Sequence, residues 1–160
     1  ATHGYFNEAS PLLSGLEFEA DGNDDGMLRV YEILDLPLNA DLVTLSACDT
    51  ALGSGYFAAL PIGDEFVGLN RAFLTAGSAS VMATLWQVDD RASVALMKQF
   101  YGHLRKPGND RNAAEALALA QRSLRRSLQL GHPYYWAAYV VVGQVNSEVE
   151  VARTSSERTS

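Results

Sequence analysis

The stretch Leu42-Val43-Thr44-Leu45-Ser46-Ala47-Cys48 decides the fold predicted for this chain. Its first six residues are apolar or small and carry no charge, which is typical of a β-strand buried on both faces of a parallel sheet. The strand leads directly into Cys48, and a loop rich in glycine and small residues follows over 49–63. Ligands bind beyond the carboxyl ends of parallel strands, so the sequence predicts that Cys48 meets a ligand.

Strand and helix patterns alternate on both sides of this stretch. We expect further strands at 15–19, 27–30, 80–86 and 138–142, and helices at 30–34, 66–74, 89–104 and 113–128. The first two strands flank the turn-rich segment 21–26 and are predicted to form a hairpin. The alternation predicts an α/β fold, a three-layer α/β/α sandwich with a mainly parallel sheet. We expect one domain over 1–145 and a polar, disordered tail over 146–160.

Composition and charge exclude several classes of partner. The net charge of the 160 residues is −7, and nucleic-acid binding needs a basic patch, so no nucleic-acid partner is expected. Arg122, Arg125 and Arg126 are interpreted as a solvated helix face. No apolar stretch approaches the roughly 20 residues of a membrane span, so no membrane partner is expected either. A single cysteine forms neither an internal disulfide nor a thiolate zinc site, which favours the reducing cytoplasm and predicts no metal or other cofactor.

The chemistry of cysteine acyl transfer selects three residues. Cys48 ends the buried strand and is the candidate nucleophile, and His3 is the candidate base. Gly4 has no side chain to obstruct its N–H group, so the amides of Gly4 and Cys48 are candidate oxyanion donors. The alternative is that Cys48 is inert core packing, as most free cysteines are. Because the chain begins at Ala-Thr-His-Gly, we expect that further strands precede Ala1 or lie on another chain.

Seven segments carry a family resemblance: 1–4, 42–50, 68–69, 71–77, 81–90, 100–101 and 132–139. They read Ala-Thr-His-Gly, Leu-Val-Thr-Leu-Ser-Ala-Cys-Asp-Thr, Gly-Leu, Arg-Ala-Phe-Leu-Thr-Ala-Gly, Val-Met-Ala-Thr-Leu-Trp-Gln-Val-Asp-Asp, Phe-Tyr and His-Pro-Tyr-Tyr-Trp-Ala-Ala-Tyr. In this order they resemble the CHAT domain, a branch of the caspase- and separase-like peptidases. The resemblance implies a caspase-like sandwich that lacks its N-terminal strands here, and a Cys48–His3 dyad. The 45 positions between the two residues are close to the spacing of about 50 in caspases.

The same resemblance implies where a peptide substrate binds. The segment Ala83, Thr84, Leu85, Trp86 and Gln87 would pair with the substrate backbone by strand addition. Trp86 would wall a side-chain pocket, or alternatively belong to the core. Asp89 and Asp90 lie where separases place an acidic residue against a basic substrate side chain, and helix capping is the alternative for at least one of them.

The sequence therefore predicts a cysteine endopeptidase that acts on a protein or peptide substrate through a thioester. An N-terminal helical-repeat region or a partner chain is the regulator that the resemblance implies. Two other functions stay open. One is a catalytically silent peptide-binding domain of the same fold, and the other is a Cys–His amidase or acyltransferase.

Overall fold

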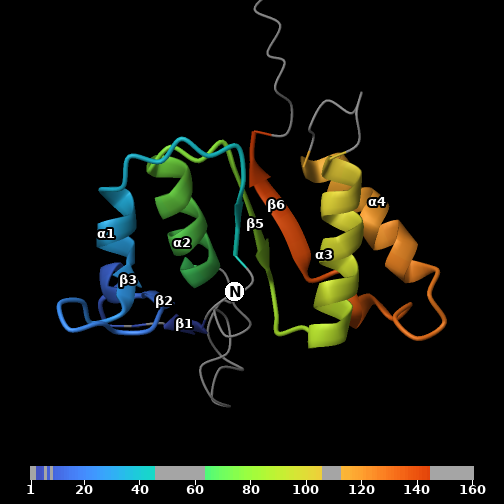
Figure 1. Ribbon diagram of the computed structural model, residues 1–160, viewed down its shortest axis with the longest axis horizontal. Helices are drawn as coiled ribbons and strands as arrows, with labels where there is room; N and C mark the ends of the chain where they lie inside the picture. Colours follow the sequence, from blue (N-terminus) through green and yellow to red (C-terminus); the bar gives the residue numbers. More distant parts are fainter. Residues whose placement is uncertain (1–2, 6, 8, 46–63, 106–112, 145–160) are drawn as a thin grey trace, which may run out of the picture.

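The computed structural model describes residues 3–5, 7, 9–45, 64–105 and 113–144, and within these ranges it contains two separate three-stranded sheets (Figure 1). The first sheet has the order β1-β2-β3, and the second has the order β4-β5-β6. Short 3-10 turns, η1 (Pro11–Leu13) and η2 (Pro133–Tyr135), precede β2 and β6.

The first sheet is antiparallel throughout. It is built from β1 (His3–Tyr5), β2 (Gly15–Glu17) and β3 (Met27–Arg29), and Leu16 lies opposite both Gly4 and Leu28. The connection from β2 to β3 contains a turn in which Asp24 N–H donates to the carbonyl of Asp21 at 2.9 Å. The predicted hairpin is thereby confirmed.

The second sheet is mixed. Its strands are β4 (Val43–Thr44), β5 (Ser80–Thr84) and β6 (Tyr139–Gly143). β4 and β5 are parallel, with Thr44 opposite Met82, whereas β5 and β6 are antiparallel, with Ala83 opposite Val140. β5 is central and all five of its residues are buried.

Four helices cover the two faces of the mixed sheet, and Figure 1 shows α1 (Val30–Leu34) and α2 (Asp64–Thr75) on one side and α3 (Asp90–Leu104) and α4 (Ala113–Arg125) on the other. The direction of the side chains along β5 explains why helices pack on both faces, because successive side chains of a strand point to opposite faces of the sheet. Val81 and Ala83 join a core cluster with α1 and α2, and Met82 joins a second cluster with α3 and α4. The apolar side chains of β5 therefore belong to both core clusters.

A glycine fixes the end of α2. Gly77 has φ +110°, a conformation that other residues rarely adopt, and a Cβ there would lie 2.2 Å from the carbonyl oxygen of Leu38. The N–H of Ser78 donates to the carbonyl of Phe73 at 3.0 Å, and the N–H of Gly77 donates to that of Leu74 at 3.2 Å. These two bonds form a Schellman motif, which satisfies the last carbonyls of the helix and turns the chain toward β5.

The prediction of a mainly parallel, caspase-like sandwich was wrong. Among the described strands only β4 and β5 run parallel, and every other strand pair is antiparallel. The reason is the connection between β5 and β6. A single crossover helix returns the chain to start a parallel strand, but here two successive helices, α3 and α4, intervene and β6 runs opposite to β5. The predicted disordered tail lies outside the described residues.

Candidate functional site

The carboxyl ends of β4 and β5 point to the end of the molecule at which the small sheet lies (Figure 1). Both strands run from the end where α2 stops toward the end where β1 lies, and α3 begins just after β5. The fold therefore places Leu45, the residues after Thr84 and the strand that carries His3 at one end of the molecule.

His3 is exposed and opens β1, an edge strand of the small sheet. The strand β1 pairs antiparallel with β2. His3 lies directly opposite Glu17, and paired residues in a sheet share a face. Leu16, on the other face, is buried in the first core cluster, so the side chains of His3 and Glu17 lie on the outer face.

Among the strands that the structure describes, β1 is at the edge of the small sheet, and Gly4 lies in its middle. The N–H of Phe18 donates to the carbonyl of Gly26 at 2.6 Å, and the N–H of Val30 donates to the carbonyl of Ser14 at 2.7 Å. In β2 and the residues beside it, the backbone N–H and C=O groups of even-numbered residues therefore point toward β3. Glu17 is odd-numbered, so its backbone N–H and C=O groups point the other way, toward His3 in β1. Gly4 follows His3 in the chain, so the backbone groups of Gly4 point away from β2. An edge strand presents such groups unpaired by a neighbouring strand.

A hollow of about 320 Å³ lies on the outer face beside this pair. It is lined by Tyr5, Asn7, Leu13, Glu17, Met27 and Arg29. Arg29 is held there by Asp25 and Glu32, and the hydrogen bond from its guanidinium lowers the pKa of the Asp25 carboxyl. No motif in the sequence indicates Glu17. The alternating pattern at 15–19 places Glu17 on the solvent face, but it does not show which residue of another strand lies opposite Glu17. That information comes from the strand register in the structure.

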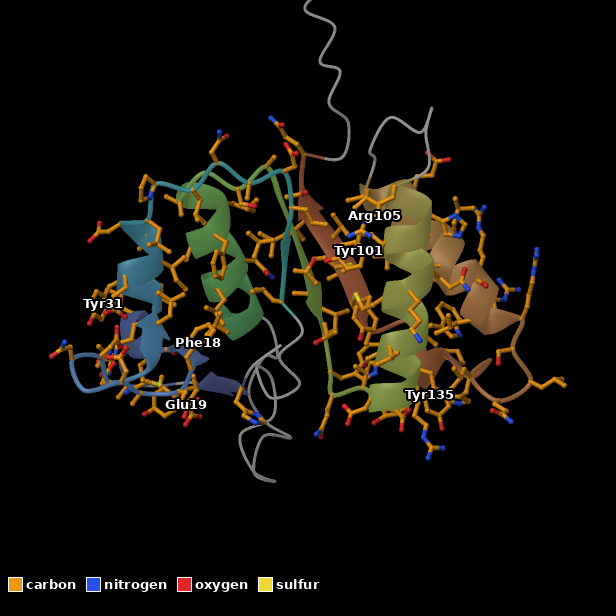
Figure 2. The ribbon with its side chains drawn as sticks, in the orientation of Figure 1. Phe18, Glu19, Tyr31, Tyr101, Arg105 and Tyr135 are labelled. Atoms are coloured by element: carbon orange, nitrogen blue, oxygen red, sulfur yellow. The ribbon has the colours of Figure 1, made fainter. Side chains whose placement is uncertain are left out.

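Cys48 lies outside the described residues, and the structure fixes the chain up to three positions before it. The N–H of Leu45 donates to the carbonyl of Met82 at 2.8 Å, which holds the end of β4 against β5. The hydroxyl groups of Thr44 and Tyr101 are hydrogen-bonded at 2.9 Å, so α3, which packs on one face of the sheet, also holds β4 (Figure 2). The end of β4 is thus restrained from two directions.

The predicted substrate-binding segment begins inside the mixed sheet. Ala83 and Thr84 are buried in β5, Leu85 and Gln87 are exposed, and Trp86 is half-buried beyond the end of the strand. On one side this segment is already paired, because Leu85 N–H donates to the carbonyl of Ala138 at 2.9 Å. The backbone groups of Thr84 and Trp86 alternate to the other side, where the described part of β4 stops at Thr44.

Trp86 and Asp89 both have structural partners. The Trp86 indole Nε1–H donates to the carbonyl of Tyr134 at 3.1 Å, and its ring packs against the second core cluster. Asp89 is the N-cap of α3, because its carboxylate accepts from the N–H of Ala92 at 3.0 Å. Asp90 is exposed in the first turn of α3. The capping interpretation is thus correct for Asp89.

Comparison with known proteins identifies the family to which the chain belongs. The family model described as the CHAT domain matches residues 1–144. The chain belongs to the CHAT family. The match spans both sheets and all four described helices, as well as His3 and Cys48. CHAT domains are related to the caspase-like peptidases, which is the relationship that the sequence motifs indicate.

Two curated relatives of the CHAT chain are named Tetratricopeptide repeat protein 28. The mouse protein (Mus musculus) is 33% identical over 130 residues, and the human protein (Homo sapiens) is 31% identical over 130 residues. Each alignment covers 81% of this chain but only 5% of the relative. The chain therefore spans a small part of the length of these relatives, whose names describe repeats and not an activity.

In the ranges that the structure describes, no group of His, Cys, Asp and Glu is arranged to hold a metal ion. In the same part of the chain, no helix has both the length and the apolar character that crossing a membrane requires.

Proposed function

We propose that this CHAT domain is a cysteine endopeptidase in which Cys48 is the nucleophile and His3 is the general base. The observation that carries the proposal is that the family match runs continuously over 1–144 and so includes both residues. The fold adds support, because β4 runs toward the end of the molecule at which β1, which carries His3, lies.

The chemistry follows from the residue types. His3 takes the proton of the Cys48 thiol, and the thiolate attacks the carbonyl carbon of the peptide bond. The N–H groups of Gly4 and Cys48 stabilise the oxyanion, and the outward direction of the Gly4 backbone supports its role. His3 then protonates the leaving amine, and water hydrolyses the thioester.

The substrate would bind as an added strand along Ala83–Gln87. Two features support this placement: the backbone groups of Thr84 and Trp86 face the side on which described β4 stops, and the opposite side is filled by β6. Trp86 would then flank a side-chain pocket while its Nε1–H stays bonded to Tyr134. Asp90 is the acidic residue that stays available to a basic substrate side chain, because Asp89 already caps α3.

We also propose that helical repeats regulate the peptidase. The relatives are named for tetratricopeptide repeats, which are helix–turn–helix units, and the CHAT chain spans only 5% of their length. The single cysteine makes the reducing cytoplasm the proposed compartment, since a reactive thiolate stays reduced there.

A positional peptide library tests the proposed function directly. Incubated with the protein that carries this domain, the library should give cleavage products with one consistent residue before the scissile bond, read by mass spectrometry. A peptidase selects such a residue because the added strand puts one side chain into a pocket. Binding of peptides without cleavage would instead identify a silent groove, and hydrolysis of simple amides without side-chain preference would identify an amidase.

Glu17 is predicted to orient His3. Cβ atoms of directly paired strand residues lie roughly 5 Å apart, so the Glu17 carboxylate can accept from one imidazole N–H and hold the tautomer that leaves the other nitrogen basic. Glu17→Gln is expected to lower kcat about 10-fold with little change in KM, because substrate contacts are intact. Steady-state kinetics on the selected library peptide measures both constants.

The matched control is Glu19→Gln, which removes the same charge two residues later in the exposed part of the same segment (Figure 2). Glu17→Asp keeps the carboxylate and should recover part of the lost kcat. An equal loss of kcat in the Glu19 and Glu17 variants would mean that the sheet has a general charge effect and that Glu17 has no specific role.

A further inference from the structure

α3 presents an exposed stripe of alternating cationic and apolar side chains. Arg91, Val94, Lys98, Tyr101 and Arg105 follow one another at spacings of three and four residues, so they lie along one side of the helix. The opposite side is anchored in the core by Ala92, Leu96 and Phe100, each fully buried. The stripe is about 21 Å long at the rise of an α-helix.

Apolar surface in the stripe is exposed between the charges. Val94 is 53% exposed and Tyr101 is 36% exposed. A groove of about 680 Å³ runs between α3 and α4 beside Val94 and Lys98, with Leu124 and Leu130 in its opposite wall. A second hollow of about 590 Å³ lies along α3 between Val94 and Arg105. The stripe is therefore a ridge with apolar hollows beside it, which is the surface shape that a packed helix requires.

Charge is distributed unevenly between this layer and the rest of the chain. The described residues between 89 and 130 include six Lys or Arg residues (91, 98, 105, 122, 125 and 126) but only three Asp or Glu residues (89, 90 and 115). This layer is thus cationic in a chain whose total charge is −7. The three cations of the stripe, Arg91, Lys98 and Arg105, recur every seven residues, which is two turns of a helix.

We propose that the stripe on α3, together with the α3–α4 groove, is the docking surface for an acidic amphipathic helix of a partner segment. Leucine-like side chains of that helix would enter the groove beside Val94. Carboxylates at heptad spacing would meet Arg91, Lys98 and Arg105, since helices packed side by side match such repeats. The surface lies on the sheet face opposite α2, so occupying it leaves β1 uncovered. Asp90 lies at the end of the groove beside Arg91, so the partner helix would also cover the carboxylate proposed to meet a basic substrate side chain and would compete with the substrate there.

A helix fits the stripe better than a nucleic acid does. A nucleic-acid strand needs cations that track a backbone together with several aromatic stacking platforms. Here the residues between the cations are Val94 and one tyrosine, whose hydroxyl is already bonded to Thr44. Apolar residues between cations at a helical repeat are instead the complement of an amphipathic helix with acidic flanks.

The test uses the whole chain and a fluorescent synthetic peptide of about three heptads, with Leu at the a and d positions and Glu at e and g. Fluorescence anisotropy should show saturable binding that weakens as salt is raised. Lys98→Glu is expected to weaken binding about 10-fold, because one cation of the repeat becomes an anion. Val94→Ser should weaken binding by removing the apolar contact, with no change in the salt dependence.

Two controls keep the test specific. Arg71→Glu reverses an exposed charge on α2, across the sheet from the stripe, and should leave the affinity unchanged. A peptide with Lys in place of every Glu should not bind. Equal binding of the Glu and Lys peptides, or equal loss in the Lys98 and Arg71 variants, would overturn the proposal. So would competition by a single-stranded oligonucleotide, or self-association of the chain that Lys98→Glu abolishes.

Discussion

The Cys48→Ala variant should lose peptide cleavage by at least about 1,000-fold while its melting temperature stays close to that of the unaltered protein. Removing the nucleophile removes the covalent route entirely, and the remaining oxyanion donors and binding contacts alone accelerate hydrolysis weakly. The change is conservative in volume, so no large cavity forms. Cleavage of the selected library peptide and a thermal melt on the same preparation measure the two effects.

His3→Ala is the companion variant. It should also abolish cleavage, and it should slow alkylation of Cys48 by a neutral thiol reagent, because the imidazole raises the fraction of thiolate. A residue that only packs would not change that rate. Cleavage retained by Cys48→Ala would contradict the assignment of the nucleophile. Fast alkylation retained by His3→Ala would contradict the assignment of the base.

The Phe100→Ala variant should lose about 3–5 kcal/mol of unfolding free energy, the largest loss of stability that we expect from one substitution. Phe100 is fully buried in the cluster that joins α3 and α4 to the mixed sheet, and its ring packs edge-to-face on Tyr101 with 5.0 Å between ring centroids. Truncation leaves a cavity that close packing cannot fill. A melting-temperature decrease of roughly 6–20 °C follows for a chain of this size.

Val94→Ala on the same helix is the matched control. Val94 is 53% exposed, so its truncation should change stability by less than about 0.5 kcal/mol. Because Tyr101 bonds to Thr44, loss of Phe100 should also loosen the end of β4. Faster hydrogen exchange at Leu45 in the Phe100 variant would report this. Equal losses of stability in the two variants would show that α3 is not anchored through its inner face.

The sequence alone determined most elements and the family. The helices α2 and α3 followed from apolar residues at helical spacing, and α4 followed from its Ala- and Leu-rich sequence. Such signals are local, because capping and amphipathic periodicity involve residues within one or two turns of each other. The hairpin of β2 and β3 was predictable for the same reason, since its two strands are joined by a short turn. The family motifs are local strings as well.

The tertiary structure decided what depends on residues distant in sequence. The direction of β6 followed from the two helices that precede it, and no local pattern in Tyr139–Gly143 distinguishes a parallel from an antiparallel strand. The strand register decided that Glu17 lies opposite His3.

The cationic stripe on α3 shows the same division. Its charges are visible in the sequence, but only packing decides which side of the helix stays exposed and that α4 forms a groove beside it. Periodicity is set by the backbone geometry of each segment. Direction, register and exposure are set by which buried surfaces meet, and those contacts join residues far apart in the chain.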